Sequence, residues 1–185
     1  ELLAFESEDG KTPQTAEELA NLFINDYLKI PNIANSWSLE RRLNVVFATA
    51  KLITLRFSEF SHQSDPQPAS GQTFYNIERQ TGRLLQLNDL LTPGYEGALN
   101  TIGEQIFREV RKIPVTASLD SLGFNFKNGT FLLNNNMGIT QEGLVFYFNS
   151  YEIAPYTVGP TQLMIPYESI SHLIRPDGLL ASFIH

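Results

Sequence analysis

The feature that most constrains the fold is a pair of strand-like runs joined by a turn-rich connector near the C-terminus. Leu144–Phe148 and Leu163–Tyr167 are rich in aromatic and aliphatic residues, which is typical of paired strands. The connector between them, Asn149–Pro160, contains two prolines and a glycine, so it is expected to change the direction of the chain. Its one charged residue is Glu152. The pattern predicts a sheet with a shaped loop between two of its strands.

Two segments have the periodicity of amphipathic helices. Thr15 followed by Glu18 is a capping-box pattern, and apolar residues then recur at helical spacing until Pro31. A second helix is predicted to start at Thr92-Pro93, with threonine as the cap, and to end before Pro114. A short helix is expected over Tyr167–Leu173.

The remaining patterns predict strands and turns. Strand-like runs occupy residues 43–60, with a bend, a bulge or a continuous strand through 48–51, and residues 73–77. Short strands are also predicted at Leu2–Phe5, Phe124–Phe126 and Phe131–Leu133. Because helices and strands do not alternate regularly, we expect an α+β fold, with a mainly antiparallel sheet and two main helices packed on one face.

Length and composition favour one domain over residues 1–185, with an N-terminal helix part of about residues 1–60 and a C-terminal part of about 70–185. The net charge of −7 argues against nucleic-acid binding. We interpret the basic groups Arg41-Arg42 and Arg108, Arg111 and Lys112 as solvated. The absence of cysteine excludes disulfides and thiolate metal sites. No apolar run is long enough to span a membrane.

No catalytic signature is recognisable. The serine-hydrolase elbow, the phosphate loop and the dinucleotide fingerprint are all absent. His62, His172 and His185 have no metal-site spacing. We therefore predict no metal, no cofactor and no enzymatic activity.

Two carboxylates and several tyrosines remain as candidate functional residues. Glu152 has apolar neighbours that would desolvate it and raise its pKa; the alternative is a structural acceptor that fixes the connector. Asp89 is either a second acid or a turn residue before a helix. Tyr147, Tyr151, Tyr156 and Tyr167 are suited either to stacking on sugars and anchoring a partner or to filling the core.

The connector, with Phe148–Tyr156, Gly159 and Ile165-Pro166-Tyr167, resembles the C-terminal hallmark of an extracellular bacterial domain family of unknown function. That family forms the sensor region of the anti-sigma factor RsiV and also occurs beside peptidoglycan deacetylase domains. Thr81-Gly82-Arg83 and Leu87–Leu91 resemble its step into a helix, and Thr15–Leu28 resembles its first helix. Where family members often carry a Gly-Gly-Ala-His-like segment, this chain has Pro68–Gln72 without a histidine.

The resemblance implies an exported, non-catalytic domain at the periplasm or the outer cell surface, with a signal peptide and a lipid anchor upstream. Its ligand would be a protein such as lysozyme, or a cell-wall glycan. The expected ligand-binding residues are Tyr151, Glu152, Tyr156 and Tyr167. The expected structural motif is Asp89, Glu152, Pro155 and Gly159. Two alternatives stay open: a carbohydrate-active hydrolase using Glu152 with a second acid such as Asp89, and a structural module of a multidomain envelope protein.

Overall fold

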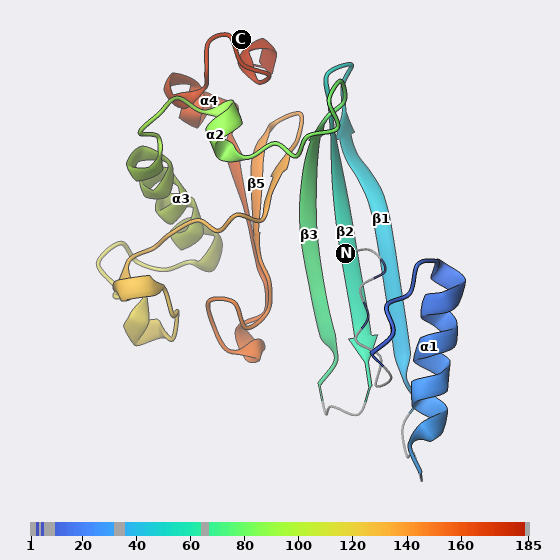
Figure 1. Cartoon of the computed structure of the whole chain (residues 1–185). Helices are drawn as coiled ribbons and strands as arrows, with labels where there is room; N and C mark the ends of the chain where they lie inside the picture. Colours follow the sequence, from blue (N-terminus) through green and yellow to red (C-terminus); the bar gives the residue numbers. More distant parts are fainter. Residues whose placement is uncertain (1–2, 4, 6–9, 32–35, 64–66, 184–185) are drawn as a thin grey trace. The chain divides into compact units, whose positions relative to one another are not determined.

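The computed structural model describes residues 3, 5, 10–31, 36–63 and 67–183 (Figure 1). It is an α+β fold with two three-stranded antiparallel sheets, ordered β1-β2-β3 and β4-β5-β6. The expected α+β class is confirmed, although the strands form two sheets where one was expected. The predicted strand at Leu2–Phe5 and the C-terminal His185 lie wholly or largely outside the described residues.

The strands are β1 (Ser38–Ala48), β2 (Leu52–His62), β3 (Ala69–Glu78), β4 (Met137–Ile139), β5 (Gly143–Phe148) and β6 (Thr161–Pro166). The helices are α1 (Ala16–Lys29), α2 (Leu87–Leu90), α3 (Glu96–Arg111) and α4 (Tyr167–Ile170). Short 3-10 turns lie at η1 (Asp120–Leu122), η2 (Lys127–Gly129), η3 (Tyr156–Val158), η4 (Ser171–Leu173) and η5 (Ala181–Phe183).

The chain divides into two compact units. The first comprises Glu1–Arg41 and Glu59–Ser70, and the second comprises Arg42–Ser58 and Gly71–His185. In the first unit, α1 begins at the predicted cap, because the Thr15 hydroxyl accepts a hydrogen bond of 3.1 Å from the Glu18 N–H. Phe23 of this helix packs its ring against Phe5 and Trp37.

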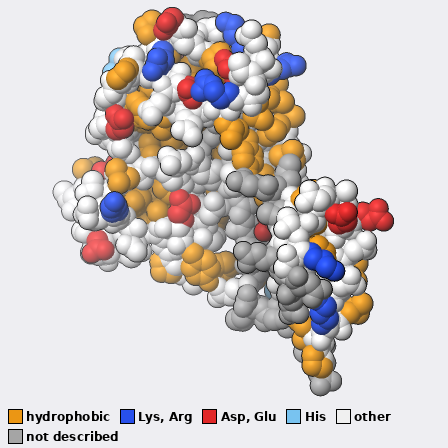
Figure 2. Space-filling view, viewed as in Figure 1, with side chains coloured by type: hydrophobic (Ala, Val, Ile, Leu, Met, Phe, Trp, Pro, Cys, Tyr) orange, Lys and Arg blue, Asp and Glu red, His pale blue; other side chains and the backbone are white. Residues whose placement is uncertain are grey.

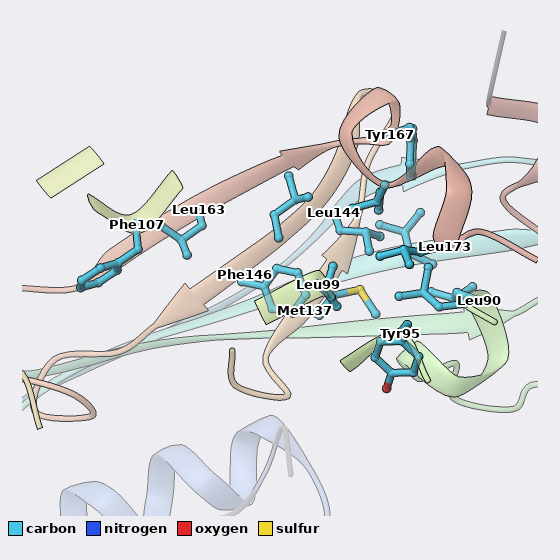
Figure 3. Packing of buried hydrophobic residues seen from close by; sticks show 14 of the residues in the cluster. Leu90, Tyr95, Leu99, Phe107, Met137, Leu144, Phe146, Leu163, Tyr167 and Leu173 are labelled. Atoms are coloured by element: carbon cyan, nitrogen blue, oxygen red, sulfur yellow. The ribbon is translucent and has the colours of Figure 1, made fainter. Parts of the chain in front are cut away.

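The second unit holds the principal hydrophobic core. Helix α3 packs on β6, and the fully buried Phe107 of α3 lies among four other phenylalanine rings (Phe124, Phe126, Phe131 and Phe148) at 5.0–6.4 Å between centroids. Figure 3 shows further members of this core, among them Leu99, Met137, Phe146 and Leu163. This core supports the β5–β6 pair and the connector between its strands.

Of the alternatives for residues 48–51, the bend is the one found, because β1 ends at Ala48 and the chain bends at Ala50 and Lys51 before β2. Two other local predictions are wrong. The second long helix begins at Glu96 and not at Thr92, whose N–H and hydroxyl both donate to the carbonyl of Leu173. The segments 124–126 and 131–133 are not strands; they are irregular segments that carry buried phenylalanines.

Three asparagines of the second unit join the edge of β3 to the second sheet. The Asn76 amide accepts from the Ile139 N–H at 2.8 Å and donates to the Met137 carbonyl at 2.7 Å. Asn136 accepts from the Phe74 N–H at 2.9 Å and donates to the Gln72 carbonyl at 2.7 Å. Asn149 pairs in the same way with both backbone groups of Gln72. Side-chain amides therefore satisfy backbone groups that a neighbouring strand would otherwise pair.

Candidate functional site

The connector Asn149–Pro160 leaves β5 through a tight turn. The Glu152 N–H donates to the Asn149 carbonyl at 3.2 Å, and Tyr151 between them has φ 67°, in the left-handed region. A non-glycine residue with such a φ is uncommon and costs about 1 kcal/mol or more. Ile153 anchors the end of the turn: its side chain is buried, and its carbonyl accepts a hydrogen bond of 2.7 Å from the Asn125 N–H.

Glu152 braces the turn with both carboxylate oxygens. Its Oε2 accepts from the Asn149 N–H at 2.8 Å, and its Oε1 accepts from the Asn134 amide at 2.7 Å. Asn134 also donates to the Tyr147 carbonyl at 2.8 Å, which ties the turn to β5. Glu152 is nevertheless exposed to solvent, so the expectation that its apolar sequence neighbours would desolvate it is wrong.

Tyr151 and Tyr156 form an aromatic pair on this turn. Their ring centroids lie 5.4 Å apart at an interplanar angle of 33°. Tyr151 is 65% exposed, and Tyr156 is half-buried in the turn that Pro155 opens. An exposed aromatic face held by a braced backbone is suited to packing against a sugar ring or an apolar group of a partner.

The other end of the connector is held by Arg111 of α3, a residue that the sequence analysis treated as solvated. Its guanidinium donates to the carbonyls of Val158, Gly159 and Pro160 and to the Thr161 hydroxyl. Burial lowers the pKa of Arg111. The interpretation of Arg111 as solvated is therefore wrong. Its four acceptors lie about 50 residues further along the chain, so the sequence around Arg111 does not reveal them.

Tyr147 and Tyr167 do not share the exposed position of Tyr151. Tyr167 is only 4% exposed, stacks on Phe183 at 5.6 Å, and donates its hydroxyl to the Thr140 carbonyl at 2.8 Å. Burial raises the pKa of both tyrosines, and for Tyr147 the nearby Arg56 opposes this shift. The hydroxyl of Tyr167 is therefore engaged within the core.

Asp89 lies in the short helix α2, within a separate group of charges. One of its oxygens accepts from the Gln86 N–H at 2.8 Å, and the other pairs with Arg83 at 2.6 Å. Burial alone would raise the pKa of this carboxyl, but the bonds from Gln86 and Arg83 outweigh burial and lower it. Asp89 thus caps α2 from within that helix, where the sequence indicated a turn residue before a helix.

Within the part of the chain that the structure describes, no three histidine or carboxylate side chains lie together as a metal site would require. Within the same residues, no helix is both long and apolar enough to cross a membrane.

Comparison with known proteins bears on the fold. Residues 88–168, which include α3 and the connector, match the model of DUF3298, described as a protein of unknown function. No functionally curated protein matches the chain. A DUF3298 family member from Bacteroides fragilis has a solved structure with a TM-score of 0.71 at 22% identity, over 91% of this chain and 66% of that one.

A DUF3298 family protein from Pseudomonas aeruginosa gives a TM-score of 0.69 at 20% identity, over 90% of this chain and 72% of that one. The chain therefore spans just under two thirds of the Bacteroides protein and somewhat more of the Pseudomonas protein. Identities of this size show a shared fold. Residues 88–168 carry a DUF3298 domain match, on a fold that two DUF3298 proteins share.

Proposed function

We propose that this protein is a non-catalytic binding or sensor domain of the bacterial cell envelope, which holds a protein or a cell-wall glycan on the connector Asn149–Pro160. One observation carries the proposal: Tyr151 is 65% exposed, has a left-handed backbone and lies beside Tyr156. Exposed aromatics in fixed positions supply much of the free energy of binding in protein interfaces.

The bracing around the connector supports this role. Glu152 and Asn134 hold its first turn, and Arg111 holds its last residues. A loop that is fixed before binding loses less conformational entropy when a ligand docks. The cost of holding Tyr151 at positive φ is therefore consistent with presentation of its ring to a partner.

The engaged carboxylates favour binding over hydrolysis. Both oxygens of Glu152 and both of Asp89 already accept hydrogen bonds from the protein. The lowered pKa of Asp89 also makes it a poor proton donor at neutral pH. A glycoside hydrolase needs one carboxyl group that is protonated and one that is free to act on the sugar or on water.

The charge of the chain bears on the choice of ligand. A net charge of −7 favours association with a basic protein such as lysozyme through long-range attraction. This attraction raises the association rate and weakens as salt is added. The resemblance to the sensor family also makes export and a lipid anchor upstream part of the proposal.

The test measures binding to lysozyme and to soluble peptidoglycan fragments at several salt concentrations. We expect one of the two to bind, and Tyr151→Ala to weaken that binding about tenfold or more. Leu84→Ala is the matched control, since Leu84 is 54% exposed and lies outside the connector. The proposal is overturned if neither probe binds, or if Tyr151→Ala and Leu84→Ala bind the probe equally well.

A further inference from the structure

A polar hollow lies at the end of the second unit that contains α2 and the turn after η4. Its volume is about 300 Å³, at the lower end of the range for small-molecule sites, roughly 300–1,000 Å³. Its walls carry three basic and three acidic side chains, Lys51, Glu78, Arg83, Asp89, Arg175 and Asp177. Figure 2 shows side chains of both signs interspersed over this end of the unit, at the top of the view.

Backbone hydrogen bonds fix the three segments that form this hollow. The Arg79 N–H donates to the Lys51 carbonyl at 2.8 Å, which joins the β1–β2 turn to the end of β3. The Arg175 N–H donates to the Leu90 carbonyl at 3.1 Å, and its guanidinium donates to the carbonyls of Leu91 and Asn88. The hollow is therefore already formed in the absence of a ligand.

Four of the six charges have protein partners. Arg83 pairs with Asp89 at 2.6 Å and lies 3.8 Å from Glu78, while Arg175 is bonded to backbone carbonyls. The exceptions are Lys51 and Asp177. Among residues 3, 5, 10–31, 36–63 and 67–183, neither side chain has an ion-pair or hydrogen-bond partner. Lys51 and Asp177 are both exposed to solvent, so one ammonium and one carboxylate line the same small hollow with no protein partner to displace among the described residues.

We propose that this hollow binds a small zwitterion of the α-amino-acid class. Lys51 would receive the ligand's carboxylate and Asp177 its ammonium group, each as a charge-assisted hydrogen bond. The neighbouring Arg83–Asp89 pair leaves the wall electrically balanced, so a ligand with both charges suits it better than a simple anion or cation. The ligand is a free α-amino acid, because a residue at either end of a peptide keeps only one of these two charges.

The experiment follows backbone amide signals by NMR during titration with alanine and with the dipeptide Ala-Ala. N-acetylalanine, which lacks the ammonium group, and alaninamide, which lacks the carboxylate, are the matched ligands. We expect alanine to shift the amides near Lys51 and Gly178, and each blocked ligand to bind about tenfold more weakly or worse. Ala-Ala, whose ammonium and carboxylate lie on different residues, is expected to bind more weakly than alanine.

Protein variants check the same assignment. Lys51→Met and Asp177→Asn are each expected to lower the affinity for alanine about tenfold or more, whereas Lys127→Met, an exposed lysine outside the hollow, leaves it unchanged. The absence of shifts at millimolar ligand, or equal binding of alanine and its blocked forms, overturns the proposal. Because none of these residues lies in the connector, this result is independent of lysozyme or glycan binding at Tyr151.

Discussion

At the scale of single residues, asparagine side chains act as substitutes for strand backbone. Asn76 is only 4% exposed and offers one acceptor and one donor to β4, as a paired strand would. Its Oδ1 also accepts from the Thr54 hydroxyl at 3.0 Å. These bonds satisfy the Ile139 N–H and the Met137 carbonyl, which are otherwise buried polar groups without a partner.

Asn76→Ala is therefore expected to destabilise the second unit by about 2 kcal/mol or more, because each buried group left unpaired costs about 1–3 kcal/mol. The measurement is the free energy of unfolding in urea. Asn125→Ala is the control, since Asn125 is exposed and its side chain forms no hydrogen bond among the described residues. If both variants lower the free energy of unfolding by a similar small amount, the buried hydrogen bonds of Asn76 do not stabilise the second unit as expected.

Asp89 has a pH dependence that follows from its lowered pKa. A carboxyl whose pKa is lower in the folded state stabilises the fold above its unfolded pKa, about 3.9, and loses this contribution as pH falls through the folded value. Asp89→Asn should therefore reduce stability at neutral pH, with a difference from the unsubstituted protein that shrinks on acidification below about pH 4. The free energy of urea unfolding of both proteins, measured across pH, tests this prediction. A stability difference that grows in acid would contradict the lowered pKa of Asp89.

The sequence did not reveal these roles because the partners are remote. The partners of Asn136 in β3 lie 62 and 64 residues away along the chain. Arg111 similarly holds a segment 47–50 residues further along the chain. Local patterns identify the residue type that a turn or a helix tolerates, but not the distant backbone that its side chain will meet.

At the scale of elements, periodic segments were predicted best. The repeat of apolar residues and the Thr15 cap located α1 correctly, and the aromatic runs located β5 and β6. The segments 124–126 and 131–133 were mistaken for strands because their apolar residues are typical of strands, with Asn125 between two phenylalanines in the first. In the structure Phe124, Phe126 and Phe131 converge on Phe107 from irregular segments, so burial and not strand pairing explains the pattern.

Two glycines provide an element-scale test with opposite signs. Gly159 ends η3 at φ 71° and ψ 179°, a conformation essentially restricted to glycine. Gly97 lies in the helix α3. At both positions, a Cβ atom added to the backbone would meet no other atom within 4 Å. Gly159→Ala should therefore cost about 1–3 kcal/mol. Gly97→Ala should stabilise by about 0.5–1 kcal/mol. Thermal unfolding measures both, and equal effects would show that the backbone of Gly159 is not restrictive.

At the scale of the whole molecule, burial is distributed unequally between the two units. The large core cluster, including Phe107, Phe146 and Leu163, belongs to the second unit. The described part of the first unit has few buried residues, among them Leu19 and the charged Asp26. Because apolar burial supplies most of the stabilisation, the second unit should be the more stable of the two.

The single tryptophan of the chain allows this difference to be measured. Trp37 belongs to the first unit and packs against Phe23 and Tyr27, so its fluorescence reports unfolding there. We expect the fluorescence transition at a lower urea concentration than the loss of hydrogen-exchange protection in α3, because units of different local stability open separately. Phe107→Ala is expected to reduce the free energy of unfolding of the second unit by about 3–5 kcal/mol. It should therefore lower the urea concentration at which α3 loses protection far more than the urea midpoint of the Trp37 fluorescence. Coincident transitions in both proteins would instead show that the two units unfold as one cooperative body.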